Sequence, residues 1–92
     1  MPTDRMSKFF YVYILQSATD EKRFYTGLTD DLRKRLINHN AGRVRHTAKW
    51  RPWYLKTYVA LGDHERTADF ERYLKSSSGR AFLRKRQSTL AA

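Results

Sequence analysis

The chain of 92 residues contains no cysteine, only four glycines and two prolines, and no long hydrophobic run. The missing cysteines exclude a disulfide framework, a cysteine-ligated zinc site and a thiol nucleophile. The longest apolar run, residues 9–15, is much shorter than the roughly 20 residues that cross a bilayer, and the N-terminus lacks the basic-then-apolar plan of a signal peptide. These absences predict a cytoplasmic protein without a membrane segment.

The size of the chain limits its organisation. A chain this short forms one domain that buries roughly 60–65% of its unfolded surface, so we expect a modest core and a single site. A composition of 40% hydrophobic and 14% aromatic residues is typical of a folded protein rather than a disordered one. We expect a flexible N-terminal tail at residues 1–7, one domain at residues 8–87 and a C-terminal tail at residues 88–92.

Acidic residues are scarce and unevenly placed. Nineteen Lys and Arg against nine Asp and Glu give a net charge of +10, and residues 32–62 contain no acidic residue. Aromatic and basic residues interleave in that window, an arrangement that suits a nucleic acid whose phosphates attract cations while its bases lie on rings. A solvated basic surface is the alternative. A membrane surface is a poorer partner, because no segment combines a broad apolar face with a basic one.

Residue patterns predict a small sheet with helices around it. Alternating aromatic and β-branched residues indicate strands at 8–16, 23–28 and 53–61, the first two joined by a polar hairpin link. Helices are expected up to about Asn40, with Gly42 stopping the first, from Gly62–Asp63 to about Lys75, and over 80–87 after a break at 76–79. The order ββαβαα predicts an α+β domain with a three-stranded, mainly antiparallel sheet flanked by helices.

The first helix carries a notable pair of side chains. Thr29 or Asp30 can cap it, with Asp30 and Asp31 in its first turn. On a helical wheel Leu32, Leu36 and Ile37 form the buried stripe. Arg35 and His39, four apart, share one edge of that stripe and should lie at the boundary between helix and sheet. There the guanidinium can grip a phosphate and the imidazole can exchange a proton, although an ordinary basic helix is equally consistent.

Glu71 is the second candidate, because it falls on the inward face that Thr67, Phe70 and Leu74 define. A carboxylate on such a face requires a cation or a hydrogen-bond donor. Mg²⁺ would serve, since it commonly takes one or two protein carboxylates and completes its shell with water and phosphate. A structural ion pair with an arginine is the competing interpretation, slightly favoured by spacing alone.

Two strand tyrosines complete the set. Tyr13 and Tyr25 lie side by side if the hairpin pairs in register. Taken singly, each is more typical of packing than of catalysis. Near a metal and an arginine, however, a phenol can position or deprotonate an attacking water.

Several motifs in order resemble the GIY-YIG nuclease superfamily and, more closely, its small stand-alone bacterial members. Tyr11-Val12-Tyr13 stands in the place of Gly-Ile-Tyr, and Tyr25-Thr26-Gly27 in the place of Tyr-Ile-Gly. Residues 28–42 look like the family's helix with its arginine and histidine, residues 70–75 like the helix with its metal-binding glutamate, and residues 74–82 like the usual end of the small proteins. The likeness covers roughly residues 8–86 and departs from the pattern at Tyr11, which replaces a glycine, and at Leu28, where some relatives carry a lysine.

The resemblance implies a metal-dependent endonuclease that hydrolyses DNA, selective for structure rather than sequence, in DNA repair or processing. It implies Tyr13 and Tyr25 at the water, Arg35 on the scissile phosphate, proton transfer by His39, and Glu71 as ligand of one Mg²⁺ or Mn²⁺. Residues expected to bind nucleic acid are Arg33, Lys34, Arg43, Arg45, His46, Lys49, Arg51, Lys75 and Arg80. His46 is a weaker candidate for a catalytic role.

Two other functions remain open on the sequence. One is a non-catalytic nucleic-acid-binding module on the same scaffold, and the other is a structural partner for an acidic protein. DNA rather than RNA is the expected target, and selectivity would come from substrate shape or from a partner protein, or would be weak. A monomer and a weak dimer are both consistent with the sequence.

Overall fold

A computed structural model describes residues 8–81 of the chain. Three strands, β1 (Phe10–Ser17), β2 (Phe24–Thr29) and β3 (Trp53–Leu61), form one antiparallel sheet in the order β2-β1-β3. Two helices, α2 (Leu32–Asn40) and α3 (His64–Lys75), and the 3₁₀ turn η1 (Ala48–Trp50) accompany the sheet. A further helical stretch begins at residue 77 and continues to 81, the last described residue. The predicted α+β class, the three-stranded antiparallel sheet and the order ββαβαα are confirmed.

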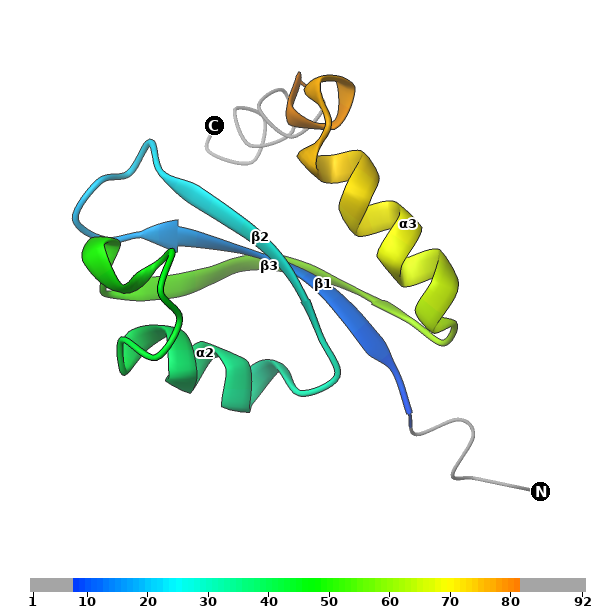
Figure 1. The fold of residues 1–92 in the computed structure, drawn as a ribbon, viewed down its shortest axis with the longest axis horizontal. Coiled ribbons are helices and arrows are strands. Elements are labelled where there is room, and N and C mark those ends of the chain that lie inside the picture. The colour runs from blue at the N-terminus through cyan, green and yellow to red at the C-terminus, as the bar shows by residue number, and fades with distance from the viewer. Residues whose placement is uncertain (1–7, 82–92) are drawn as a thin grey trace.

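The central position of β1 follows from its sequence. Val12, Tyr13, Ile14 and Leu15 are all buried, so β1 is apolar on both faces, as a strand covered on both sides must be. Figure 1 shows the reason: α2 and α3 lie on opposite faces of the sheet. Each helix therefore covers one set of alternating β1 side chains.

The two faces have different cores. On the α2 face, Tyr13, Leu15 and Trp53 form a buried cluster, against which Leu32 and Leu36 of α2 pack. On the α3 face, the Phe10 ring meets the His64 ring edge-on at 4.9 Å between centroids, and Thr67 and Leu74 are the buried residues of α3. The face of the sheet that carries Tyr13 is thus the face that α2 covers.

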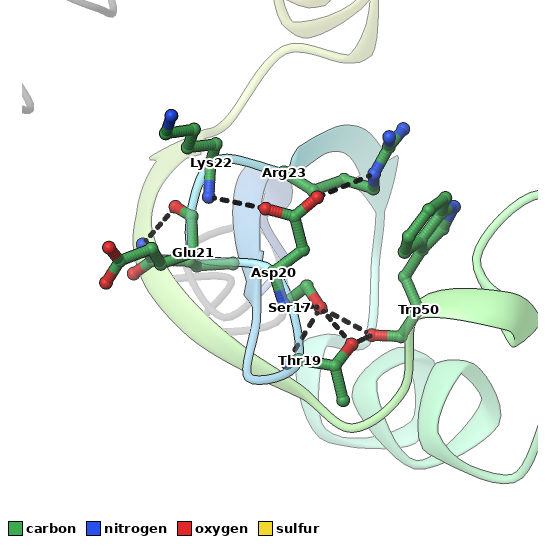
Figure 2. Close-up of polar contacts among 8 residues, drawn as sticks. Ser17, Thr19, Asp20, Glu21, Lys22, Arg23 and Trp50 are labelled. Carbon is green, nitrogen blue, oxygen red and sulfur yellow. Dashed lines mark hydrogen bonds and ion pairs between the residues drawn. The ribbon is translucent and has the colours of Figure 1, made fainter.

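Figure 2 shows how the β1–β2 hairpin is fastened to η1. The buried Ser17 hydroxyl donates to the Trp50 carbonyl oxygen at 2.7 Å and accepts from the Thr19 and Asp20 backbone N–H groups at 3.1 and 3.2 Å. The Arg23 guanidinium, paired with Asp20, lies 3.7 Å from the centroid of the Trp50 ring. These contacts connect the hairpin to the basic loop at residues 41–52.

The first helix begins one or two residues later than the sequence suggested. Asp31, rather than Thr29 or Asp30, is the N-cap of α2, and its carboxylate accepts from the Lys34 backbone N–H at 3.0 Å. Thr29 ends β2 and uses its hydroxyl to accept from the Asp31 backbone N–H at 3.1 Å, so it is engaged in the turn before the cap. The sequence predicted Asp30 and Asp31 in the first helical turn. That prediction is wrong, because both residues precede the helix.

Other boundaries differ by small amounts. Strands β1 and β2 begin and end one or two residues later than predicted, while β3 and α3 are as predicted. Gly42 follows α2 with a φ of +79°, which explains why a glycine ends this helix. The last helix begins at residue 77, three residues earlier than expected, and its predicted part beyond 81, like the two predicted tails, lies outside the described residues.

Ile37 was wrongly placed in the buried stripe of α2. Its side chain is 57% exposed, because it lies about 100° further round the helix than Leu36 and beyond the edge of the sheet contact. Among residues 8–81, no helix has the length and apolar character needed to span a bilayer.

Candidate active site

The Tyr13 hydroxyl is the centre of the candidate site. It is 2.9 Å from His39 Nε2, and it accepts a hydrogen bond from Arg35 Nε at 3.1 Å. Both partners come from α2, where they are one turn apart, so the helix presents them together to the central strand. Tyr13 is 1% exposed and His39 is fully buried, whereas Arg35 is partly exposed. The predicted location of Arg35 and His39 at the boundary between helix and sheet is therefore confirmed.

Gly27 explains how the Tyr13 ring fits over β2. It is the register partner of Tyr13, and a Cβ at Gly27 would lie 2.4 Å from the Tyr13 hydroxyl oxygen and 2.5 Å from Cζ. Real Cβ atoms do not approach so closely, so any larger residue would displace the phenol. The glycine of the Tyr25-Thr26-Gly27 motif is thus required because it leaves room for the ring of Tyr13, the last residue of the Tyr11-Val12-Tyr13 motif.

Tyr25 lies diagonally to Tyr13, since its own register partner is Leu15. Its ring centroid is 6.3 Å from that of Tyr13 and 5.0 Å from that of His39. The two tyrosines are neighbours, as expected from a hairpin in register, but Gly27 rather than Tyr25 is opposite Tyr13. Tyr25 consequently packs against the outer side of the Tyr13–His39 pair.

Thr47 orients the His39 ring from behind. Its hydroxyl is 2.7 Å from His39 Nδ1 and itself donates to the Val44 carbonyl oxygen at 3.3 Å. Because the hydroxyl proton is used on Val44, Thr47 accepts from Nδ1–H, which leaves Nε2 as the acceptor for the Tyr13 O–H. A directed chain results, in which Arg35 donates to Tyr13, Tyr13 to His39, His39 to Thr47, and Thr47 to Val44.

Two residues that flank the basic loop, Asn40 and Trp53, hold Thr47 in this position. The Trp53 indole Nε1 donates to the Thr47 carbonyl oxygen at 2.7 Å. The Asn40 side chain, at the end of α2, binds the Trp53 backbone twice, at 2.6 and 2.9 Å. Thr47 is 1% exposed. Sequence reasoning did not identify this residue, because its partner becomes apparent only when the loop folds back onto α2.

Burial and charge set the protonation of the site. Burial, assisted by the positive charge of Arg35, lowers the pKa of His39 from 6.5 to about 4, so the ring is neutral at pH 7. Burial also raises the pKa of Tyr13 above its ordinary value of 10.0, while Arg35 opposes that shift. The hydrogen bond with Tyr13 raises the pKa of Arg35, which stays charged. A neutral phenol donating to a neutral imidazole is what these shifts require.

Glu71 lies on α3 near the end of the helix. Its side chain is 20% exposed, and its Oε2 pairs with Lys75 Nζ at 3.1 Å. The negative charge of Glu71 contributes to the raised pKa of Tyr13, although less than burial does. The partner that the partly buried carboxylate requires is thus a lysine of its own helix, not an arginine.

A divalent ion could be held only with few protein ligands. Within residues 8–81, no three His, Cys, Asp or Glu residues gather as a metal-binding group. Mg²⁺ does not need such a group, because one carboxylate with water and substrate phosphate completes its shell. The single carboxylate of Glu71, near enough to the Tyr13 phenol to affect its pKa, therefore fits an ion that binds mainly through water and substrate.

The candidate nucleic-acid-binding residues are all exposed: Arg33, Lys34, Arg43, Arg45, His46, Lys49, Arg51, Lys75 and Arg80. Exposure of His46 sets it apart from the buried network, although its neighbour Thr47 belongs to that network. Arg35 also reaches the surface, since it lines an open hollow at the β2–α2 junction with Thr29, Asp30 and His64. A ligand in this hollow would have access to the guanidinium.

Comparison with known proteins agrees with this geometry. Residues 9–87 match the GIY-YIG catalytic domain. The chain belongs to the GIY-YIG family. It is 36% identical over 76 residues to a UPF0213 protein of Streptococcus pyogenes serotype M5 (strain Manfredo), and 34% identical over 76 residues to a UPF0213 protein of Streptococcus pyogenes serotype M1. Each alignment covers 82% of this chain and 80% of the relative, and no solved structure matches the chain.

The match to the GIY-YIG catalytic domain spans both tyrosine motifs as well as Arg35, His39 and Glu71. The resemblance drawn from Tyr11-Val12-Tyr13 and Tyr25-Thr26-Gly27 is confirmed. The GIY-YIG domain suggests nuclease activity and nucleic-acid binding, and nucleases of this family generally use a divalent metal.

Proposed function

We propose that this protein is an endonuclease that hydrolyses phosphodiester bonds in DNA with the help of Mg²⁺ or Mn²⁺. The observation that carries the proposal is the Tyr13 hydroxyl, held between Arg35 Nε and His39 Nε2 in a chain of the GIY-YIG family. Selectivity for DNA structure rather than sequence is part of the proposal.

The hydrogen-bonded chain suggests how an attacking water loses its proton. The water gives a proton to the Tyr13 oxygen while the Tyr13 proton moves to His39 Nε2, which is neutral and oriented to accept it. Thr47 then stabilises the resulting imidazolium through Nδ1–H. The hydroxide attacks phosphorus, the bond to the leaving oxygen breaks, and that oxygen takes a proton from solvent.

Arg35 and Tyr25 support this reaction. The Arg35 guanidinium, with Nε on Tyr13, directs its positive charge to the place where the phosphate gathers negative charge, which favours the transition state. Tyr25 packs on His39 and keeps water from its ring. Glu71 would hold the divalent ion, whose chemistry is to polarise the phosphate and neutralise its charge.

The proposal is tested by incubating the pure protein with duplex, single-stranded and branched DNA in Mg²⁺ or Mn²⁺. We expect metal-dependent cleavage that Glu71→Ala and Tyr13→Phe abolish. DNA binding should persist in both variants, because the exposed cations supply most of the affinity. Equal products from the wild-type protein and the Glu71→Ala protein would overturn the assignment, since a contaminating nuclease gives that result.

A non-catalytic nucleic-acid-binding module is the second candidate. The Glu71–Lys75 ion pair favours it, because the pair satisfies the carboxylate without a metal. On this alternative the protein binds DNA with a steep salt dependence, and added Mg²⁺ yields no product.

A further inference from the structure

Lys75 joins two parts of the candidate site that lie on different elements. Its Nζ is 3.1 Å from Glu71 Oε2 and 5.9 Å from the centroid of the Tyr25 ring. Tyr25 in turn packs on His39 at 5.0 Å between ring centroids. The ammonium therefore lies between the carboxylate of α3 and the aromatic side of the Tyr13–His39 pair.

The setting of Lys75 allows its ammonium to change partners. The side chain is 47% exposed, so the ammonium keeps contact with water. A lysine has a long flexible stem and three donors without a fixed geometry, and a helical pair four residues apart is weak when its lysine is in contact with water. Leaving Glu71 thus costs little, provided that another cation takes its place on the carboxylate.

A divalent ion and an ammonium compete for the same carboxylate. Two cations within about 4 Å repel each other, so Glu71 cannot hold both at full occupancy. A nearby phosphate gives the displaced ammonium a new anionic partner. Metal on Glu71 is therefore compatible with Lys75 on a phosphate, whereas metal and Lys75 together on Glu71 oppose each other.

We propose that Lys75 is an exchangeable cation of the active site. In the free protein Lys75 rests on Glu71, and it transfers to a phosphate of the bound nucleic acid when Glu71 takes a divalent ion. This assignment rests on the proposed function, and it makes the nucleic-acid contact expected of Lys75 dependent on metal.

The first test is metal binding without nucleic acid. Mn²⁺ titrations followed by electron paramagnetic resonance compare the wild type with Lys75→Met and with the matched control Arg72→Met. Arg72 has the same charge on the same helix, but it pairs with Asp69 and is 69% exposed. We expect Lys75→Met to bind Mn²⁺ about three-fold more tightly, as removal of a weak competing pair implies, and Arg72→Met to match the wild type. Unchanged, weaker or undetectable binding by Lys75→Met overturns the proposal.

The second test is the salt dependence of binding to DNA with non-hydrolysable phosphorothioate linkages. With Mn²⁺ present, the slope of log affinity against log salt should fall by about 0.9 in Lys75→Met, the loss of one phosphate contact. Without metal, the slope should equal that of the wild type, because Lys75 is then on Glu71. Lys75→Arg should restore most of the metal-dependent slope. An equal fall with and without metal overturns the exchange.

Failure of the proposed function is distinguishable from failure of this inference. If the wild type cuts no DNA yet both binding tests give the expected results, the exchange stands and the nuclease assignment falls. If the wild type cuts DNA but Lys75→Met binds Mn²⁺ and DNA as the wild type does, the nuclease assignment stands and the exchange falls. Circular dichroism of each variant, compared with Arg72→Met, establishes that the folds are equivalent.

Discussion

At the scale of single residues, the Thr47 hydroxyl determines which nitrogen of His39 carries the proton, and it thereby leaves Nε2 as the acceptor for Tyr13. Thr47→Val keeps the shape but leaves the buried Nδ1–H without an acceptor, a loss of about 1–3 kcal/mol in the free energy of unfolding. We expect DNA cleavage to fall about ten-fold or more, as the loss of an oriented base implies. Urea unfolding and single-turnover kinetics measure these effects.

Thr47→Ser is the matched control, because it keeps the hydroxyl and should retain most of the rate. Nitrogen-15 chemical shifts of His39 separate orientation from simple destabilisation. The wild type and Thr47→Ser should show the Nδ1–H form, whereas Thr47→Val should show a mixture or the other form. The same form in all three proteins would contradict the role of Thr47.

The buried neutral His39 makes stability depend on pH. Its folded pKa of about 4 lies below the ordinary value of 6.5, so the unfolded chain binds a proton that the folded protein does not. Stability from this residue is fully present above pH 6.5 and is lost as pH falls toward 4, by about 3 kcal/mol in total. Urea unfolding at a series of pH values measures the loss, and His39→Gln should have a flatter profile between pH 7 and 4. Parallel profiles for the two proteins would disprove the shift.

Some residues of the candidate site could be predicted from the sequence, and others could not. Tyr13, Arg35 and His39 could be grouped from motif order and helical spacing, because both reflect neighbours along one element or one hairpin. Thr47 could not, since it reaches His39 only through a loop that Trp53 and Asn40 fold back. The lysine partner of Glu71 follows ordinary four-residue spacing, but the chain also contains many arginines that could have paired with the carboxylate.

At the scale of elements, the start of α2 decides where Arg35 and His39 lie. The Asp31 carboxylate caps the helix, while the adjacent Asp30 is exposed and outside it. We expect Asp31→Ala to lower the free energy of unfolding by about 1 kcal/mol, the usual value of a lost cap. Asp30→Ala, which removes the same charge, should leave stability nearly unchanged. Thermal and urea unfolding of both variants measure the difference, and a larger effect at Asp30 would contradict the assignment of the cap.

The elements themselves were largely predictable because their patterns are local. Alternation along β1 and β3 and the stop at Gly42 identified the sheet and the end of α2. The cap was misplaced because three neighbouring residues, Thr29, Asp30 and Asp31, all have capping side chains. The choice depends on where β2 ends: Thr29 completes the strand and its turn, so Asp31 is the first residue free to begin a helix.

At the scale of the whole molecule, the excess of positive charge gathers in residues 32–62, which include α2, the basic loop and β3. Ser17 and Arg23 of the hairpin hold that loop through Trp50 (Figure 2). The exposed Arg43 and Arg45 therefore belong to a surface whose position on the molecule is fixed. A basic surface with a fixed position makes a fixed set of phosphate contacts, whereas attraction by net charge alone does not favour one face of the protein over another.

Two double variants that lose the same charge distinguish these two cases. One is Arg43→Ser/Arg45→Ser in the basic loop, and the control is Arg66→Ser/Arg72→Ser on the outer side of α3. We expect the basic-loop variant to reduce the salt slope of DNA binding by about 1.8, the loss of two phosphate contacts, while the control changes it little. Cleavage at saturating DNA should be unaffected, because the Tyr13–His39–Thr47 chain remains intact. Fluorescence anisotropy over a series of salt concentrations measures the slopes. Equal slopes in the two variants would mean that DNA responds to the total charge of the protein and that the basic loop has no contact of its own.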